Sequence, residues 1–227
     1  MKTITSLLLG LMLAAFFALT GCQPRTEPES DLVATHNEVE ANHSEQTVDE
    51  LKITAESVPV EVRLASDGQF SYEYDGDEYA VTTAANGSAF EIKITDITPE
   101  ADSGSNVVVY IPAQSYTRIT GVSEGSSLIL PAINADITVT SNAGSVVLGL
   151  SPDYNKTLDY TGNASSCSLS MNGVNDFAVN AKISTSAVQI PSGWPAYDML
   201  RSAYRYTSGN GTAKINIDVT SSSFMFN

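Results

Sequence analysis

The chain has 227 residues, of which 42% are hydrophobic and 16% charged, and 26 acidic against 11 basic side chains give a net charge of −15. This deficit of Lys and Arg argues against nucleic acid as a partner, because neutralising phosphates requires clustered positive charge. Abundant Ser, Thr, Val and Ile favour strands over helices, so we expect an all-β fold.

The first 21 residues have the composition of an export signal peptide. Lys2 precedes an apolar stretch over residues 4–19, which is too short to span a bilayer, and Leu19-Thr20-Gly21-Cys22 follows. These four residues resemble the lipobox of bacterial lipoproteins. The resemblance implies cleavage after Gly21 and a diacylglyceryl group on the sulfur of Cys22. It also implies a lipid-anchored protein of the cell membrane or outer membrane, facing the outside of the cytoplasmic membrane.

Residues 22–51 are predicted to be the lipid anchor followed by a flexible acidic tether. The segment carries many acidic side chains, with no alternation of apolar residues, so it cannot bury enough apolar area to offset its ordering entropy. We expect His36 and His43 to be solvated rather than to bind metal. The folded domain is predicted to cover residues 52–227.

Strict alternation of apolar and polar residues predicts strands across residues 58–95. Asp75-Gly76 and Asn86-Gly87 separate alternating runs and are typical of hairpin turns, so we expect an antiparallel meander. Asp75, Asp77 and Glu78 also offer oxygen ligands to Ca²⁺. The backbone preference of hairpin turns for Asp and Gly is the simpler explanation of this cluster.

The segment Val107–Pro112 is continuously apolar, which predicts a strand buried on both faces. Four similar short segments then recur roughly 20 residues apart, with apolar anchors at Leu128, Val146, Leu169 and Val188. This repeat predicts a β-solenoid-like stack, that is, a single-stranded β-helix. Because the spacing is uneven, a β-sandwich remains the alternative.

Cysteine and histidine usage argues against a catalytic centre. If Cys22 carries lipid, Cys167 is the one remaining thiol, and its setting among small residues predicts an inert, buried side chain. No histidine follows His43, so serine triads and histidine-based metal sites cannot be assembled in the domain. We therefore predict no catalytic residues, no metal and no cofactor.

The C-terminal region is rich in aromatic residues. Helical spacing over residues 196–204 predicts a short helix or irregular loop, and residues 215–219 alternate as a final strand. Trp194, Tyr197, Tyr204 and Tyr206 are expected to cap an exposed strand edge. The alternative is a platform for a sugar or a partner protein.

The order of these features is similar to a known family. The Tyr72–Asp77 hairpin, the Phe90–Ile94 strand, the apolar run over 107–112, the repeats and the closing segment over 209–219 together resemble the bacterial putative-adhesin domain of repeated β-strands. The resemblance covers roughly residues 52–227 and implies an exported or membrane-attached protein with a β-helix-like stack and no assigned activity. Ser126-Ser127, Ser166-Cys167 and Thr185-Ser186 stand where the family has glycine.

These observations favour a non-enzymatic, adhesin-like or envelope-interaction module that contacts a surface glycan or an envelope protein. One alternative is an accessory subunit of a membrane sensor or transporter. Another is a polysaccharide-active enzyme with a β-helix fold, which would use paired carboxylates.

Overall fold

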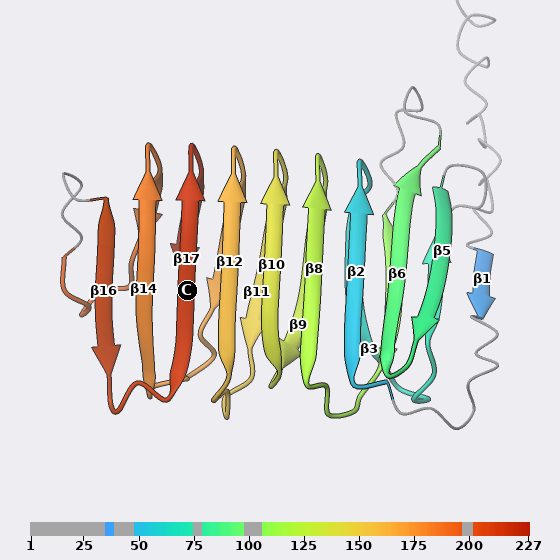
Figure 1. Ribbon diagram of the computed structural model, residues 1–227, viewed down its shortest axis with the longest axis horizontal. Helices are drawn as coiled ribbons and strands as arrows, with labels where there is room; N and C mark the ends of the chain where they lie inside the picture. The colour runs from blue at the N-terminus through green and yellow to red at the C-terminus, as the bar shows by residue number, and fades with distance from the viewer. Residues whose placement is uncertain (1–34, 39–47, 75–78, 98–105, 197–201) are drawn as a thin grey trace, which may run out of the picture. The chain divides into compact units, whose positions relative to one another are not determined.

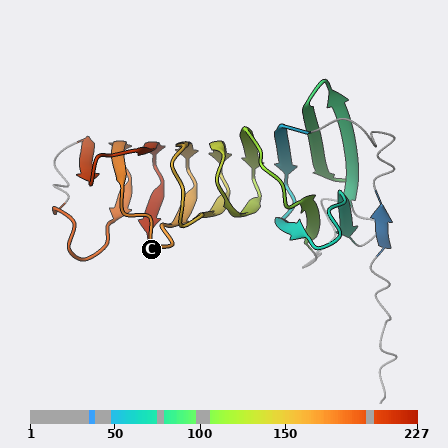
Figure 2. The ribbon, with the colours of Figure 1, turned by 90° about the horizontal axis from the view of Figure 1, so that it is seen from below.

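Residues 35–38, 48–74, 79–97, 106–196 and 202–227 are described by the computed structural model, and all belong to one unit of the chain, Ala34–Asn227. These residues form strands and turns without a helix, which confirms the all-β prediction. The strands lie in two layers (Figures 1 and 2). The predicted lipobox with Gly21 and Cys22 lies outside the described residues. So do five other residues singled out from the sequence: His43, Asp75, Asp77, Glu78 and Tyr197.

Two mixed sheets of nine strands each enclose the core of the described residues, in a sandwich-like arrangement. Sheet A has the spatial order β1 (Thr35–Glu38), β4 (Ser71–Tyr74), β7 (Val107–Pro112), β3 (Val60–Ala65), β9 (Ser127–Ile133), β11 (Ser145–Leu150), β13 (Ser166–Ser170), β18 (Ser223–Phe226) and β15 (Ala187–Gln189). Sheet B has the order β16 (Ala203–Ser208), β14 (Phe177–Ser184), β17 (Ala213–Thr220), β12 (Thr157–Asn163), β10 (Asp136–Asn142), β8 (Arg118–Glu124), β2 (Glu50–Glu56), β6 (Ala89–Asp96) and β5 (Tyr79–Asn86).

From β8 to β15, successive strands alternate between the sheets. Neighbours from β8 to β12 in sheet B and from β9 to β13 in sheet A pair in parallel. Leu128 pairs with Val146, as the repeat predicted. The next pairing differs, because Cys167 lies beside Val146 and Leu169 lies beside Leu148. A shift of two residues keeps the same side chains facing the core, so the apolar pattern alone does not reveal it.

Each tight turn from a sheet B strand into the following sheet A strand from β2 to β18 contains one residue with positive φ. These residues are Ser57, Gly125, Ala143, Ala164, Thr185 and Ser221, with φ between 49° and 59°. The backbone N–H groups of five of them form a ladder, from Ser57, Gly125, Ala143, Ala164 and Ser221. Gly125 donates to the carbonyl of Asn142 at 2.8 Å, and Ala143 donates to that of Asn163 at 2.9 Å. The ladder holds non-glycine residues in a strained conformation, which is how most of these turns form without glycine.

The C-terminal strands occupy a position that the sequence did not predict. Instead of ending the stack, β17 lies between β12 and β14, and β18 lies between β13 and β15. Ile215 pairs with both Leu158 and Val179, and Phe224 pairs with both Cys167 and Val188. The last segment of the chain therefore lies, in each sheet, between two strands that precede it in sequence.

The expected meander over residues 58–95 is only partly present. The turn at Asn86-Gly87 closes the antiparallel β5–β6 hairpin as predicted. The prediction of a hairpin at Asp75-Gly76 is wrong, because β4 belongs to sheet A and β5 to sheet B. Instead, β4 pairs with β7, whose predicted burial is confirmed. Tertiary pairing with this apolar strand outweighs the local turn preference.

Both ends of the predicted domain differ in detail from the expectation. Strand β1 lies within the segment expected to be a tether, and β2 begins at Glu50, two residues before the expected boundary. Near the C-terminus, Ala203 and Tyr204 form part of β16 rather than a helix. Antiparallel pairing with β14 fixes β16 as an edge strand, in which Tyr204 faces inward and Arg205 outward.

Candidate functional site

The structure brings together the described aromatic residues near the C-terminus. The Trp194 ring lies 4.9 Å from that of Tyr206 and 5.0 Å from those of Phe177 and Phe226, measured between centroids. Tyr204 is 6% exposed, and its hydroxyl donates to the carbonyl of Pro195 at 3.2 Å. Burial raises the pKa of Tyr204. This packing suits a hydrophobic cap, and the role of these residues as a binding platform stays a prediction.

Cys167 is a buried, free thiol on the inner face of β13. It is 4% exposed, and burial raises the pKa of its thiol well above the usual range. The same burial raises the pKa of the neighbouring Tyr160 to about 12. The thiol is thus protonated at neutral pH and unsuited to nucleophilic attack.

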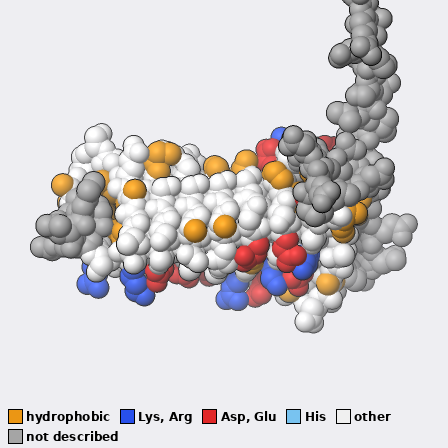
Figure 3. All heavy atoms as spheres, turned by 90° about the horizontal axis from the view of Figure 1, so that it is seen from above, with side chains coloured by type: hydrophobic (Ala, Val, Ile, Leu, Met, Phe, Trp, Pro, Cys, Tyr) orange, Lys and Arg blue, Asp and Glu red, His pale blue; other side chains and the backbone are white. Residues whose placement is uncertain are grey.

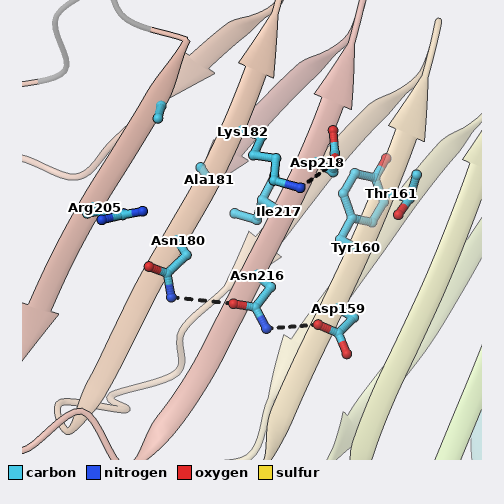
Figure 4. A pocket seen from close by; sticks show the side chains of 11 residues that line it. Asp159, Tyr160, Thr161, Asn180, Ala181, Lys182, Arg205, Asn216, Ile217 and Asp218 are labelled. Carbon is cyan, nitrogen blue, oxygen red and sulfur yellow. Dashed lines mark hydrogen bonds and ion pairs between the residues drawn. The ribbon is translucent and has the colours of Figure 1, made fainter.

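A shallow cavity of about 340 Å³ lies on the outer face of sheet B, over β12, β17, β14 and β16 (Figure 4). We call it the sheet B trough. Its two polar sides are formed by outward-facing side chains. Its floor is formed by Tyr160, Ala181 and Ile217, whose side chains are buried in the core. The trough therefore runs across the strands rather than along them.

One side of the trough is a row of four side chains at matched register. Asp159 pairs with Asn216, Asn216 with Asn180, and Asn180 with Arg205. The amide of Asn216 donates to Oδ1 of Asp159 at 2.8 Å, and the amide of Asn180 donates to Oδ1 of Asn216 at 3.4 Å. These bonds orient three polar groups along one line before any ligand arrives (Figure 4).

The other side of the trough is the next outward row on the same strands. It consists of Thr161, Asp218, Lys182 and Ala203. The ammonium of Lys182 lies 3.5 Å from Oδ2 of Asp218, and these side chains are 80% and 53% exposed. Such an open ion pair is worth less than about 1 kcal/mol, so either group can turn to a ligand at little cost. On β16, the strand that also carries Arg205, this row ends at Ala203, whose small side chain contributes little to the side of the trough.

The charge around the trough differs from that of the chain as a whole. From Lys156 to the C-terminus, the described residues carry a net charge of +1, from four basic and three acidic side chains, whereas the full chain carries −15. The seven are Lys156, Asp159, Asp176, Lys182, Arg205, Lys214 and Asp218. Figure 3 shows charged side chains gathered along the lower side of the view, where the face of sheet B lies. Anionic ligands are thus repelled less at this end.

Sequence reasoning missed the trough because its residues come from four separate segments. Asp159, Asn180, Arg205 and Asn216 each occupy an ordinary outward position of an alternating strand. Only the insertion of β17 between β12 and β14 places them side by side. No local motif signals this arrangement.

The described residues contain neither a metal-binding cluster nor a membrane-spanning helix. No three His, Cys, Asp or Glu side chains there are grouped so that they could hold a metal ion. The same residues contain no helix with the length and apolar character needed to cross a membrane.

Comparison with known proteins gives a likeness of fold. No family model matches the chain, and no curated protein matches it. A crystal structure described as a putative cell adhesion protein from Clostridium sporogenes superposes with a TM-score of 0.56 at 15% identity, covering 85% of this chain and 97% of that one. A putative adhesin from Bacteroides fragilis gives a TM-score of 0.32 at 8% identity, covering 86% of this chain and 96% of that one. A putative lipid binding protein from Parabacteroides distasonis gives 0.29 at 17%, covering 60% and 62%. The chain thus shares its two-sheet fold with the Clostridium protein.

Proposed function

We propose that the chain is a non-enzymatic, adhesin-like protein of the cell envelope that binds another surface component through the outer face of sheet B. The observation that carries the proposal is the pair of polar rows lining the sheet B trough, held in register by four strands. A face of this kind presents many hydrogen-bonding groups on a rigid support. The name given to the Clostridium protein, a putative cell adhesion protein, agrees with this role.

Lipid attachment at Cys22 is the second part of the proposal. It is supported by Leu19-Thr20-Gly21-Cys22 at the end of a short apolar segment. Two acyl chains, each stabilised by about 0.8 kcal/mol per buried CH₂, would hold the protein stably at a membrane. The acidic residues 22–51 would then set the domain apart from the lipid surface.

The third part is that the strands from β8 to β18 form a β-solenoid. Three features support it: the alternation of β8 to β15 between the two sheets, the parallel pairing of these strands and of β17 and β18 with their neighbours, and the ladder of turns with positive φ. Strand β16 departs from this pattern, because it pairs antiparallel with β14. Each coil of a solenoid adds one strand to an extended flat face. Such a face suits contact with a long polymer or a neighbouring surface.

The carboxylates of the trough support recognition rather than catalysis. Asp159 accepts a hydrogen bond from Asn216, and Asp218 lies beside Lys182. Carboxylates held in this way accept hydrogen bonds from ligand hydroxyl groups. No observation on the described residues favours the enzyme or the accessory-subunit alternative over this reading.

The proposal is tested by expressing the full chain in bacteria that lack it and counting the cells retained on surfaces coated with envelope material. We expect retention with the wild-type chain, together with protein in the membrane fraction. Cys22→Ser should release the protein from the membrane and abolish retention. Equal retention of cells with and without the chain would refute the proposal. Crosslinking of the chain to one membrane protein without any retention would favour the accessory-subunit alternative.

A further inference from the structure

Building on the proposed function, we propose that the sheet B trough binds a short, linear, acidic saccharide, with a sugar carboxylate at Arg205. Three features support this assignment: the hydrogen-bonding groups of the trough, the local charge, and the guanidinium of Arg205, with which no carboxylate of the described residues pairs.

The first row of the trough offers alternating acceptors and donors. Asn216 donates one amide hydrogen to Asp159 and accepts a hydrogen bond from the amide of Asn180. The amides of Asn216 and Asn180 each have a second hydrogen that can be donated to a ligand. Asp159 accepts the bond from Asn216 at Oδ1, which leaves Oδ2 to accept hydrogen bonds from a ligand. Sugar hydroxyl groups both donate and accept, so they match such a row, whereas a purely apolar ligand would leave it unsatisfied.

Arg205 supplies a binding group for an anion at one end of this row. Among the described residues, no carboxylate pairs with its guanidinium, although Arg63 and Arg118 each have an acidic partner. A guanidinium presents a planar fork of N–H donors that fits a carboxylate with two parallel hydrogen bonds. Lys182 lies on the adjacent strand and is 80% exposed, so its ammonium can contribute a second positive charge.

The length of the trough sets the size of the ligand. From β12 to β16 there are three strand intervals, which at roughly 4.8 Å each give about 14 Å. This length suits a trisaccharide lying across the strands. The one aromatic residue of the floor, Tyr160, is 1% exposed, so its ring cannot stack on a sugar. Binding therefore depends on hydrogen bonds and charge, and we expect it to weaken with salt.

The test is titration of the detergent-solubilised full chain with a linear trisaccharide of uronic acids, followed by calorimetry. The neutral trisaccharide of glucose serves as the comparison ligand. We expect the uronate to bind at least tenfold more tightly than the neutral sugar, and Arg205→Gln to remove that difference. Arg205→Lys, which keeps the charge but loses the fork, should retain part of it. Asn180→Ala should lower the affinity for both sugars about fivefold.

Arg118→Gln is the matched control. Arg118 is an exposed arginine on the same face of sheet B, but on β8, five strands away from β16. It should leave both affinities unchanged, and unfolding in urea should show that all variants are folded. Equal effects of Arg205→Gln and Arg118→Gln, or equal affinity for the two sugars, would overturn the assignment. If neither sugar binds while expressing cells still adhere, this inference fails and the proposed function stands; if adhesion also fails, both fall.

Discussion

The inserted position of β17 and β18 makes a specific prediction about Phe224→Ala. Phe224 is 1% exposed, and its ring lies 5.4 Å from that of Tyr160 and 4.9 Å from that of Phe226. Truncation of a buried phenylalanine costs roughly 3–5 kcal/mol, and the full burial here places the expected loss near 4 kcal/mol. Because β18 lies between β13 and β15, and β17 between β12 and β14, the loss should spread to the strands on both sides.

Native-state hydrogen exchange measures this spread strand by strand. A loss of about 4 kcal/mol corresponds to roughly a thousandfold faster exchange, at about 1.4 kcal/mol per factor of ten. We expect this acceleration in β14 and β16 as well as in β17, although β14 precedes Phe224 by about forty residues in the chain. Amides of β8 and β10 should change less than about tenfold, because neither strand is a neighbour of β17 or β18.

Leu128→Ala is the control for location. Leu128 is fully buried in β9, whose neighbours in sheet A are β3 and β11. This variant should accelerate exchange around β9 and leave β14 and β16 protected. If Phe224→Ala accelerates exchange only over residues 213–226, with β14 unchanged, the reasoning from the inserted strands β17 and β18 is refuted.

Three further predictions concern the turns and loops. Ala164→Gly should raise the free energy of unfolding by about 0.5–1 kcal/mol in urea titration, because Ala164 has φ of 49° and glycine removes the strain; a decrease would contradict this. Gly144→Ala should lower it by about 3 kcal/mol, since the added Cβ would lie 2.2 Å from the backbone oxygen of Ser126; an unchanged midpoint would show that the turn can shift. Hydrogen bonds from Thr212 hold the pKa of Asp176 below its ordinary 3.8, so this carboxylate stabilises the fold above that pH and loses its contribution as the pH falls below it. With Asp176→Asn, the free energy of unfolding should therefore fall less steeply as the pH is lowered through the acid range. An unchanged pH dependence would contradict a contribution of Asp176 to stability.

The strands were predictable from the sequence because burial on one face imposes alternation. Residues 215–219 alternate, and Val107–Pro112 is continuously apolar; the structure places both in strands. The stacking of Leu128 on Val146 followed from their similar surroundings. These predictions depend on local pattern alone, which a single chain displays directly.

The order of the strands in each sheet was not predictable from the same pattern. Ile215 could pair equally well with several alternating strands, because each presents β-branched or large apolar side chains to the core. At Asp75-Gly76 the turn preference was real, but partner strands in different sheets decided the pairing. The sheet B trough could not be predicted for the same reason. Asp159 and Arg205 belong to one site only because β17 lies between β12 and β14.

We propose that the outer face of sheet B contacts the surface component that the protein binds. Chemical modification of arginines tests this contact directly. The full chain is treated with an arginine-selective dicarbonyl reagent, free and bound to the envelope material that retains expressing cells. Arg205 lies on sheet B and Arg63 on the outer face of sheet A. We expect at least fivefold protection of Arg205 on binding, with Arg63 modified at its original rate. Protection of Arg63 with Arg205 still reactive would contradict it.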